Sequence, residues 1–218
     1  MTTGAVIPAA SVCAVILAGG RATRMGGVDK GLQLFRGQPL VQIALQRLQC
    51  QVGGTPGQIA ISANRNQARY ESLGIPVWSD SVPDYAGPLA GFLTAMQQCR
   101  GRYDYVLSVP CDSPLFPQDL LTRLATALVQ DKAEIAMAMA PERQEDGSTL
   151  LRPQPVFCLI RTNLADSLQA FLEGGGRKIG AWTASHRQIK LGFDAPGDDS
   201  RAFANANTLE ELHALETK

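Results

Sequence analysis

The chain has 218 residues, of which 45% are hydrophobic and 18% are charged, a composition typical of a soluble domain with a sizeable core. Its 20 Lys and Arg residues balance its 20 Asp and Glu residues, so no overall positive field exists to attract nucleic acid or an anionic membrane. Five scattered cysteines without a Cys-x-x-Cys pair argue against a disulfide framework or a thiolate zinc site, and we expect reduced thiols and a cytoplasmic location.

Residues 1–11 lack the basic and apolar segments of a secretion signal, and we expect a flexible tail there. Behind this tail, the apolar and β-branched run Val12–Ala18 indicates a parallel strand that is covered on both faces. Strands and helices then alternate along the chain. Further strands are predicted at 58–62, 76–78, 105–109, 134–140, 156–160 and, weakly, 189–193, and helices at 39–51, 67–73, 88–99, 117–129, 163–171 and 209–215.

This alternation predicts a three-layer α/β fold, in which a mostly parallel, twisted sheet carries helices on both faces. We expect a single domain over residues 12–218. The charged, turn-rich segment 141–155 is predicted to be a loop near a site. No stretch approaches the roughly 18 apolar residues of a membrane-spanning helix.

The segment LAGGRATRMGGVDKG, residues 17–31, places five glycines, two arginines and a lysine directly after the first predicted strand. Glycines let the backbone turn tightly and present N–H groups to a phosphate. The segment matches neither the Walker loop nor the dinucleotide fingerprint. We interpret it as a different phosphate cradle, in which Arg24 supplies a forked donor and Lys30 a mobile charge. The alternative is a solvated glycine-rich turn.

Two aspartates follow predicted strands, at the edge where ligands bind in open α/β sheets. Asp80 follows the strand at 76–78 and Asp112 follows the strand at 105–109. A nucleoside triphosphate arrives with Mg²⁺, which takes one or two carboxylates together with phosphate oxygens. We favour Asp112 as the metal ligand, although either aspartate could instead be a turn former or a helix cap.

The stretch LAGGRATRMGGVDKGL resembles the signature of Rossmann-like nucleotidyltransferases, and most closely that of the molybdenum cofactor guanylyltransferases, the MobA family. The likeness continues in order through ISANRNQARYESLGIPVWSD, DYAGPLAGFLTAM, VPCDSPLFPQDLLTRL, GGGRKIGAW and FANANTLEEL. It implies that the pterin phosphate of Mo-molybdopterin attacks GTP, giving molybdopterin guanine dinucleotide and pyrophosphate, with Mg²⁺ required. It also implies a nucleotide-binding part over about 12–115 and a pterin-side part over about 116–218.

The resemblance also implies roles for individual residues. Those with a catalytic role are Arg24, Lys30 and Asp112, and Asp112 would also hold the metal. The residues that would bind the nucleotide are Leu17, Ala18, Gly19, Gly20, Lys30, Ser62, Asp80 and Asp112. Those matching the pterin side are Arg152, Arg177, Asn205 and Asn207. Asparagines ahead of a helix are also ordinary N-caps, so this second interpretation of Asn205 and Asn207 stays open.

One position departs from the family pattern. Where the family commonly has V-N-A-N-R, this chain has ISANR, with Ser62 in place of the first asparagine. A hydroxyl offers one donor where an amide offers two, so we expect a weaker contact with the nucleotide.

The sequence leaves two alternative functions open. A molybdopterin cytidylyltransferase would be expected to carry a TAAG-like stretch where this chain has LAGG, which favours guanine. A non-catalytic carrier of nucleotide or cofactor would be free to lose Lys30 and Asp112, yet both are present. We expect a monomer that binds small molecules and, as further partners, cofactor-biosynthesis proteins or apo-molybdoenzymes.

Overall fold

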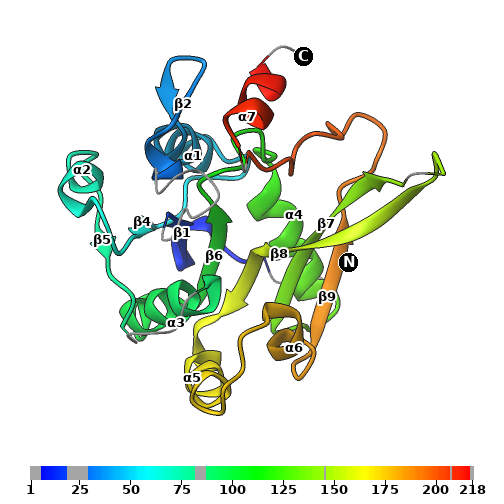
Figure 1. Ribbon diagram of the computed structural model, residues 1–218. Helices are drawn as coiled ribbons and strands as arrows, with labels where there is room; N and C mark the ends of the chain where they lie inside the picture. The colour runs from blue at the N-terminus through cyan, green and yellow to red at the C-terminus, as the bar shows by residue number, and fades with distance from the viewer. Residues whose placement is uncertain (1–5, 19–28, 82–86, 145, 207, 217–218) are drawn as a thin grey trace.

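The computed structural model describes residues 6–18, 29–81, 87–144, 146–206 and 208–216 (Figure 1). In this part of the chain, seven strands form one sheet in the order β5-β4-β1-β6-β8-β7-β9. Their bounds are β1 (Val12–Leu17), β4 (Gln58–Ser62), β5 (Val77–Trp78), β6 (Tyr105–Pro110), β7 (Ile135–Arg143), β8 (Thr149–Arg161) and β9 (Gln188–Gly192). β8 runs antiparallel to both of its neighbours, β6 and β7, and the remaining pairs are parallel. The predicted mostly parallel sheet is therefore confirmed.

Helices cover both faces of this sheet. Their bounds are α1 (Leu40–Gln49), α2 (Gln67–Glu71), α3 (Pro88–Cys99), α4 (Leu120–Gln130), α5 (Ala165–Glu173), α6 (Ile179–Thr183) and α7 (Leu209–Glu216). Alternate residues of β1 belong to two separate cores: Val12 and Ile16 pack with α1 and α4, whereas Cys13 and Val15 pack with α3, α5 and α6. Because both faces are buried, β1 is apolar throughout and shows no polar alternation.

The structure corrects the sequence prediction for 141–155. The strands β7 and β8 continue through most of this segment as a hairpin, which pairs out to Arg143 and Thr149 and extends away from the body of the sheet (Figure 1). Side chains near its end are exposed, among them Leu150 at 50%. Charged side chains that are exposed to solvent are compatible with a β-strand. The charge of the segment therefore does not predict its backbone conformation.

Several further elements were not predicted. A short hairpin joins β2 (Leu34–Phe35) to β3 (Gln38–Pro39) through Arg36 and Gly37, which both have positive φ. The helix α6 follows the glycine-rich segment after α5. Within the expected tail, Ala9–Ser11 forms a 3₁₀ turn, and the Gly57 N–H donates to the Ala9 carbonyl over 3.0 Å.

No helix within the described ranges has both the length and the apolar character needed to cross a membrane.

The loop after β6 is fixed to α1 by the side chain of Arg47. Its Nε donates to the Phe116 carbonyl over 2.5 Å, and its Nη2 donates to the Leu115 carbonyl over 3.1 Å. The guanidinium also lies 5.5 Å from the centre of the Phe116 ring. These contacts hold an irregular stretch of backbone that begins at the carboxyl end of β6.

Replacing Arg47 tests this anchoring. We expect Arg47→Leu to lower the free energy of unfolding by about 2 kcal/mol, because two carbonyls lose a charged hydrogen-bond donor. Urea unfolding followed by circular dichroism measures the change. The matched control is Arg102→Leu, which removes an exposed arginine that donates to Gln58 Oε1, and a loss within about 0.5 kcal/mol is expected. Equal losses in the two variants would show that the Arg47 contacts contribute no particular stability.

Candidate functional site

The carboxyl ends of three neighbouring strands are joined by backbone hydrogen bonds. Leu17 at the end of β1 pairs in register with Ser62 of β4 and Pro110 of β6. Beyond the strands, the Ala18 N–H donates to the Ser62 carbonyl over 2.9 Å, and the Cys111 N–H donates to the Leu17 carbonyl over 3.1 Å. The residues that the sequence placed at separate strand ends therefore lie along one edge of the sheet.

The central feature of this edge is an ion pair between Lys30 and Asp112. Lys30 begins the 3₁₀ turn η3 (Lys30–Leu32), and its Nζ lies 2.9 Å from Asp112 Oδ2. The two side chains are 24% and 16% exposed, so water still reaches the pair. Two of the three predicted catalytic residues are thus in contact, although 82 positions separate them in the chain. Arg24, Gly19 and Gly20 lie outside the described residues.

The chemistry of Asp112 fits a magnesium ion that arrives with its triphosphate. A carboxylate is the hard oxygen ligand that Mg²⁺ prefers, and Mg²⁺ is commonly held by one or two carboxylates together with substrate phosphates and water. The described residues contain no group of three or more His, Cys, Asp or Glu that could hold a metal by itself. Asp112 could supply one carboxylate to such an ion, with phosphate oxygens and water as further ligands.

A second group of polar side chains surrounds Asp80. Its carboxylate accepts from Ser62 Oγ over 3.3 Å and from Asn64 Nδ2 over 2.7 Å, while its own N–H donates to Asn64 Oδ1 over 2.8 Å. Ser62 and Asp80 were predicted to share the nucleotide site, and the structure brings them together. Asn64 was not predicted to belong there. Its presence in ISANR was visible, but the sequence did not show where its side chain faces.

Asp29 is another residue that the sequence analysis missed. Its buried carboxylate accepts from the Tyr70 hydroxyl over 2.5 Å, from Asn66 Nδ2 over 2.8 Å and from the Gly31 N–H over 3.2 Å. Burial, and then the hydrogen bond to Asp29, raise the pKa of the Tyr70 hydroxyl. Tyr70 therefore stays protonated and acts as a donor. The only signal in the sequence was an acidic residue beside Lys30, which is common in turns.

The segment before α7 is tied to the loop that carries Asp112. The Ala206 N–H donates to the Asp112 carbonyl over 2.9 Å, and Ser113 Oγ donates to Asn205 Oδ1 over 2.6 Å. The helix α7 is capped by Thr208, whose hydroxyl accepts from the Glu211 N–H over 3.1 Å. Asn205 therefore contacts the Asp112 loop and does not supply this cap. Asn207 lies outside the described residues.

Arg152 and Arg177 belong to other parts of the structure. Arg152 lies on the β7–β8 hairpin, where its Nη2 donates to Gln144 Oε1 over 3.4 Å and its Nε lies 3.9 Å from Glu142 Oε2. Arg177 follows α5, and its Nη1 donates to the Leu172 carbonyl over 3.1 Å. Their pterin-side role stays a prediction.

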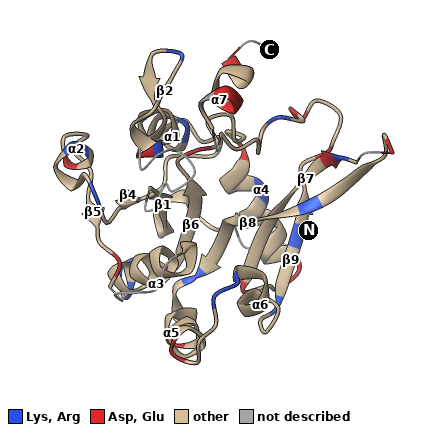
Figure 2. Cartoon of the chain, viewed as in Figure 1, with Lys and Arg blue, Asp and Glu red and all other residues tan. Residues whose placement is uncertain are grey.

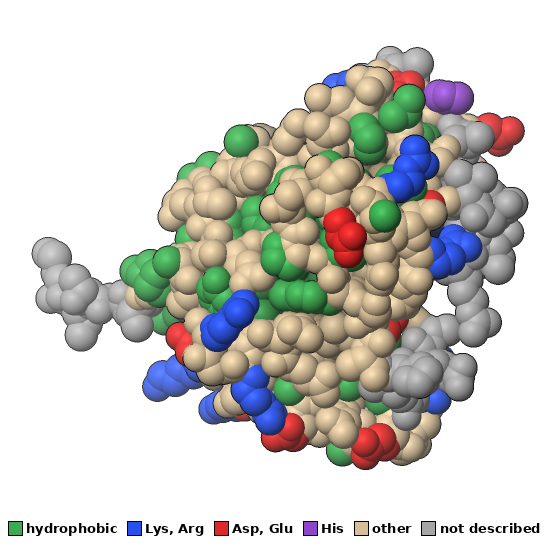
Figure 3. All heavy atoms as spheres, turned by 90° about the vertical axis from the view of Figure 1, so that its left-hand side faces the viewer, with side chains coloured by type: hydrophobic (Ala, Val, Ile, Leu, Met, Phe, Trp, Pro, Cys, Tyr) green, Lys and Arg blue, Asp and Glu red, His purple; other side chains and the backbone are tan. Residues whose placement is uncertain are grey.

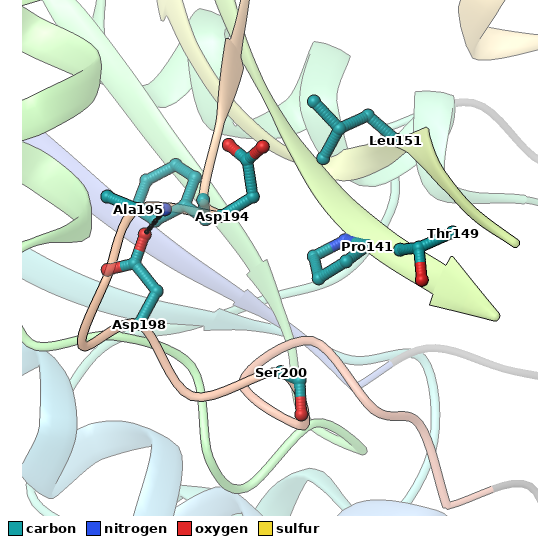
Figure 4. Close-up of a pocket in the computed structure, with 8 residues that line it drawn as sticks. Pro141, Thr149, Leu151, Asp194, Ala195, Asp198 and Ser200 are labelled. Atoms are coloured by element: carbon teal, nitrogen blue, oxygen red, sulfur yellow. Dashed lines mark hydrogen bonds between the residues drawn. The ribbon is translucent and has the colours of Figure 1, made fainter.

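A hollow of about 390 Å³ lies between the β7–β8 hairpin and the loop after β9 (Figure 4). Its lining residues are Pro141, Thr149, Leu151, Phe193, Asp194, Ala195, Asp198 and Ser200. Arg123 of α4 holds one wall in place, because it donates to both carboxylate oxygens of Asp198 over 2.8 and 3.1 Å and lowers the pKa of that group. None of the described residues that were predicted to bind nucleotide or pterin lines this hollow.

Charges of both signs are interspersed over the described chain (Figure 2). On the face shown in Figure 3, basic and acidic side chains are scattered among neutral and apolar atoms and form no continuous basic stripe among the described residues. On this face an anion would meet individual basic side chains and no extended positive surface among the described residues.

Comparison with known proteins shows which family the chain resembles. A family model described as a MobA-like NTP transferase domain matches residues 14–189. The chain is 58% identical over 206 residues to the molybdenum cofactor guanylyltransferase of Acidovorax ebreus, covering 94% of this chain and 95% of that protein. It is 57% identical over 210 residues to the protein of the same name from Albidiferax ferrireducens, covering 96% and 98% of the two chains.

Solved structures share the fold at low sequence identity. The molybdopterin-guanine dinucleotide biosynthesis protein A of Archaeoglobus fulgidus is 19% identical, with a TM-score of 0.71 over 94% of this chain and 96% of that one. The 4-diphosphocytidyl-2C-methyl-D-erythritol synthase of Anaerococcus prevotii is 10% identical, with a TM-score of 0.69 over 94% of each chain. With the family match and the relatives above 50% identity, these observations show that the chain belongs to the MobA-like NTP transferase family.

Proposed function

We propose that the chain is a molybdenum cofactor guanylyltransferase, which transfers GMP from GTP to the phosphate of Mo-molybdopterin. The observation that carries this proposal is the Lys30–Asp112 pair at the carboxyl end of β1 and β6, where a phosphate and its cation can both be neutralised. Relatives that match nearly the whole chain carry the name of this activity, which supports the same substrate pair. The products are molybdopterin guanine dinucleotide and pyrophosphate.

The reaction needs no histidine base. A phosphate monoester has a second pKa near 6, so the attacking pterin phosphate is mostly dianionic at neutral pH. One of its oxygens forms a bond to the α-phosphorus of GTP, and the bond from that phosphorus to the bridging oxygen breaks. Pyrophosphate leaves with the bonding electron pair. The main barrier is the approach of several negative charges, which positioning and positive groups relieve.

Lys30 and Asp112 would exchange partners when substrate binds. In the structure Lys30 Nζ and Asp112 Oδ2 lie 2.9 Å apart, so each charge neutralises the other. In the complex, we expect a phosphate oxygen to take the Lys30 ammonium, which leaves Asp112 to hold the cation. Mg²⁺ bound there would reduce the charge on the phosphates. Such an exchange avoids leaving either charge unpaired before GTP arrives.

The nucleoside end of GTP would lie towards Asp80 and the end of β1. The N–H of Ala18 already donates to the Ser62 carbonyl, so it is not a free donor for the nucleotide. A contact from Ala18 would therefore come from its carbonyl oxygen or from apolar packing, while the Leu17 carbonyl, which accepts from the Cys111 N–H, keeps a second lone pair for the nucleotide. The carboxylate of Asp80, held by Ser62 and Asn64, is the polar group available beside them.

The direct test is pyrophosphate release by the purified protein with molybdopterin and Mg²⁺, comparing GTP with CTP. Release with GTP and not with CTP is expected. Release with CTP would move the protein to the cytidylyltransferases. Release with neither nucleotide would favour the non-catalytic carrier.

We expect Asp112→Ala to lower turnover by roughly a thousandfold, because charge stabilisation worth several kcal/mol is lost with the metal ligand. Pyrophosphate release at limiting Mg²⁺ measures this effect. The matched control is Asp119→Ala, which removes an aspartate that lies 3.6 Å from Arg123 and is 42% exposed, and it should leave turnover unchanged. Wild-type turnover of Asp112→Ala would show that Asp112 is not the metal ligand.

Ser62→Asn tests the departure from the family pattern. We expect turnover to be kept and GTP affinity to stay equal or rise by up to about tenfold, because the amide offers a second donor near Asp80. Gly91 of α3 packs closely against this position, since a Cβ on Gly91 would lie 2.9 Å from Ser62 Oγ, so the larger asparagine has to direct its amide away from α3 and towards Asp80. Calorimetric titration with GTP measures the affinity. Ser62→Ala is the matched variant without a donor, and tighter GTP binding by Ser62→Ala than by Ser62→Asn would contradict the assignment.

A further inference from the structure

We infer that Asp29 and Tyr70 position Lys30, so that a buried tyrosine without substrate contact sets how tightly the triphosphate is held. We call the group Asp29, Gly31, Asn66 and Tyr70 the clasp. The inference rests on the proposed role of Lys30 as a phosphate ligand.

Both carboxylate oxygens of Asp29 are occupied. Oδ1 accepts from the Tyr70 hydroxyl over 2.5 Å and from the Gly31 N–H over 3.2 Å, and Oδ2 accepts from Asn66 Nδ2 over 2.8 Å. Asp29 is only 9% exposed, and a buried carboxylate is strongly destabilising unless donors surround it. The three donors therefore hold Asp29 in one place.

Lys30 stands between two residues of the clasp. Asp29 and Gly31 flank it, and the Leu32 N–H donates to the Asp29 carbonyl over 3.2 Å to close the turn. A lysine side chain is long and flexible, so the fixed backbone decides which region its ammonium can reach. In the structure this region includes Asp112, 2.9 Å from Nζ.

The close fit of Tyr70 against Gly31 supports a specific arrangement. A Cβ on Gly31 would lie 2.6 Å from the Tyr70 hydroxyl, so the ring can approach only where this side chain is missing. Tyr70 itself is fully buried. Asn66 adopts a left-handed conformation with φ of 52°, which asparagine tolerates better than most residues, while its amide donates to Asp29.

The clasp also links the two halves of the nucleotide site. Tyr70 lies in α2, and Asn66 directly precedes this helix. The helix follows β4 and precedes β5. These strands end at Ser62 and Trp78, next to the Asp80 group. The hydrogen bonds from Asn66 and Tyr70 to Asp29 therefore fix the backbone beside Lys30 relative to the βαβ unit that carries the proposed nucleoside contacts.

The test is a double-mutant cycle read by GTP affinity. Tyr70→Phe keeps the ring and removes one donor, and we expect GTP to bind about tenfold more weakly, the loss typical of a hydrogen bond to a charged group. Guanosine, which lacks phosphates and is measured by competition, should bind within about twofold of wild type. Lys30→Ala should show the same pattern. If Tyr70 acts through Lys30, the double variant binds GTP no more weakly than Lys30→Ala.

Tyr103→Phe is the matched control. It removes a hydroxyl that donates to the Gly57 carbonyl over 3.2 Å, next to the amino ends of β4 and β6, and it should leave GTP affinity unchanged. Thermal unfolding of every variant monitors folding. If Tyr70→Phe does not fold, Asn66→Ala removes a different donor from Asp29 and tests the same pattern.

The outcomes separate the inference from the proposed function. Normal GTP affinity of Lys30→Ala would show that Lys30 does not bind phosphate, and the proposed function would lose its main support. Weak GTP binding by Lys30→Ala, with normal binding by Tyr70→Phe, would overturn the clasp alone. Additive losses in the double variant, or an equal loss of guanosine affinity, would also overturn it, because Tyr70 would then act on the whole site.

Discussion

The burial of β1 between two layers of helices is the constraint on which the rest of this structure depends. Val12, Cys13, Ala14, Val15 and Ile16 are all completely buried, and β1 pairs with β4 on one side and β6 on the other. A strand in this position cannot slip by one residue, because each face is packed against different helices. The ends of three strands are thereby fixed relative to one another. The same strand pairing therefore positions the polar residues just beyond these ends.

The polar groups at this edge are neutralised or hydrogen-bonded by other groups of the protein. Lys30 pairs with Asp112, Asp80 is held by Ser62 and Asn64, and Asp29 is surrounded by donors. Each carboxylate is therefore oriented by neighbours from other segments of the chain. Preorganised groups lose little freedom when a charged substrate arrives, which favours electrostatic stabilisation of phosphate transfer. A protein without net charge can in this way bind a triphosphate.

Much of the fold could be predicted from the sequence, and the reason is visible in particular elements. The strand Gln58–Ser62 and the helix Pro88–Cys99 were predicted with the bounds that the structure shows, because one is short and apolar and the other begins with a proline after glycine. The rule that ligands lie at carboxyl ends of strands singled out Asp80 and Asp112, and the glycine-rich segment after the first strand singled out Lys30. The contact between Asp29 and Tyr70 was not predicted, since 41 residues separate them and neither belongs to a local sequence pattern. The outer part of the β7–β8 hairpin was predicted as a loop, because its sequence is rich in charged and turn-forming residues.

The ties between the Asp112 loop and the segment before α7 have a consequence for the order of assembly during synthesis. Ser113 contacts Asn205, and 92 positions separate them in the chain. All seven strands of the described central sheet, and the described helices up to α6, precede Asn205 by at least a dozen residues. Since chains emerge from the ribosome amino end first, a nascent protein can complete most of its sheet while the Asp112 loop still lacks these contacts. These contacts form only once residues 205 and 206 have emerged, so a shorter nascent chain would lack the ties that hold the Asp112 loop.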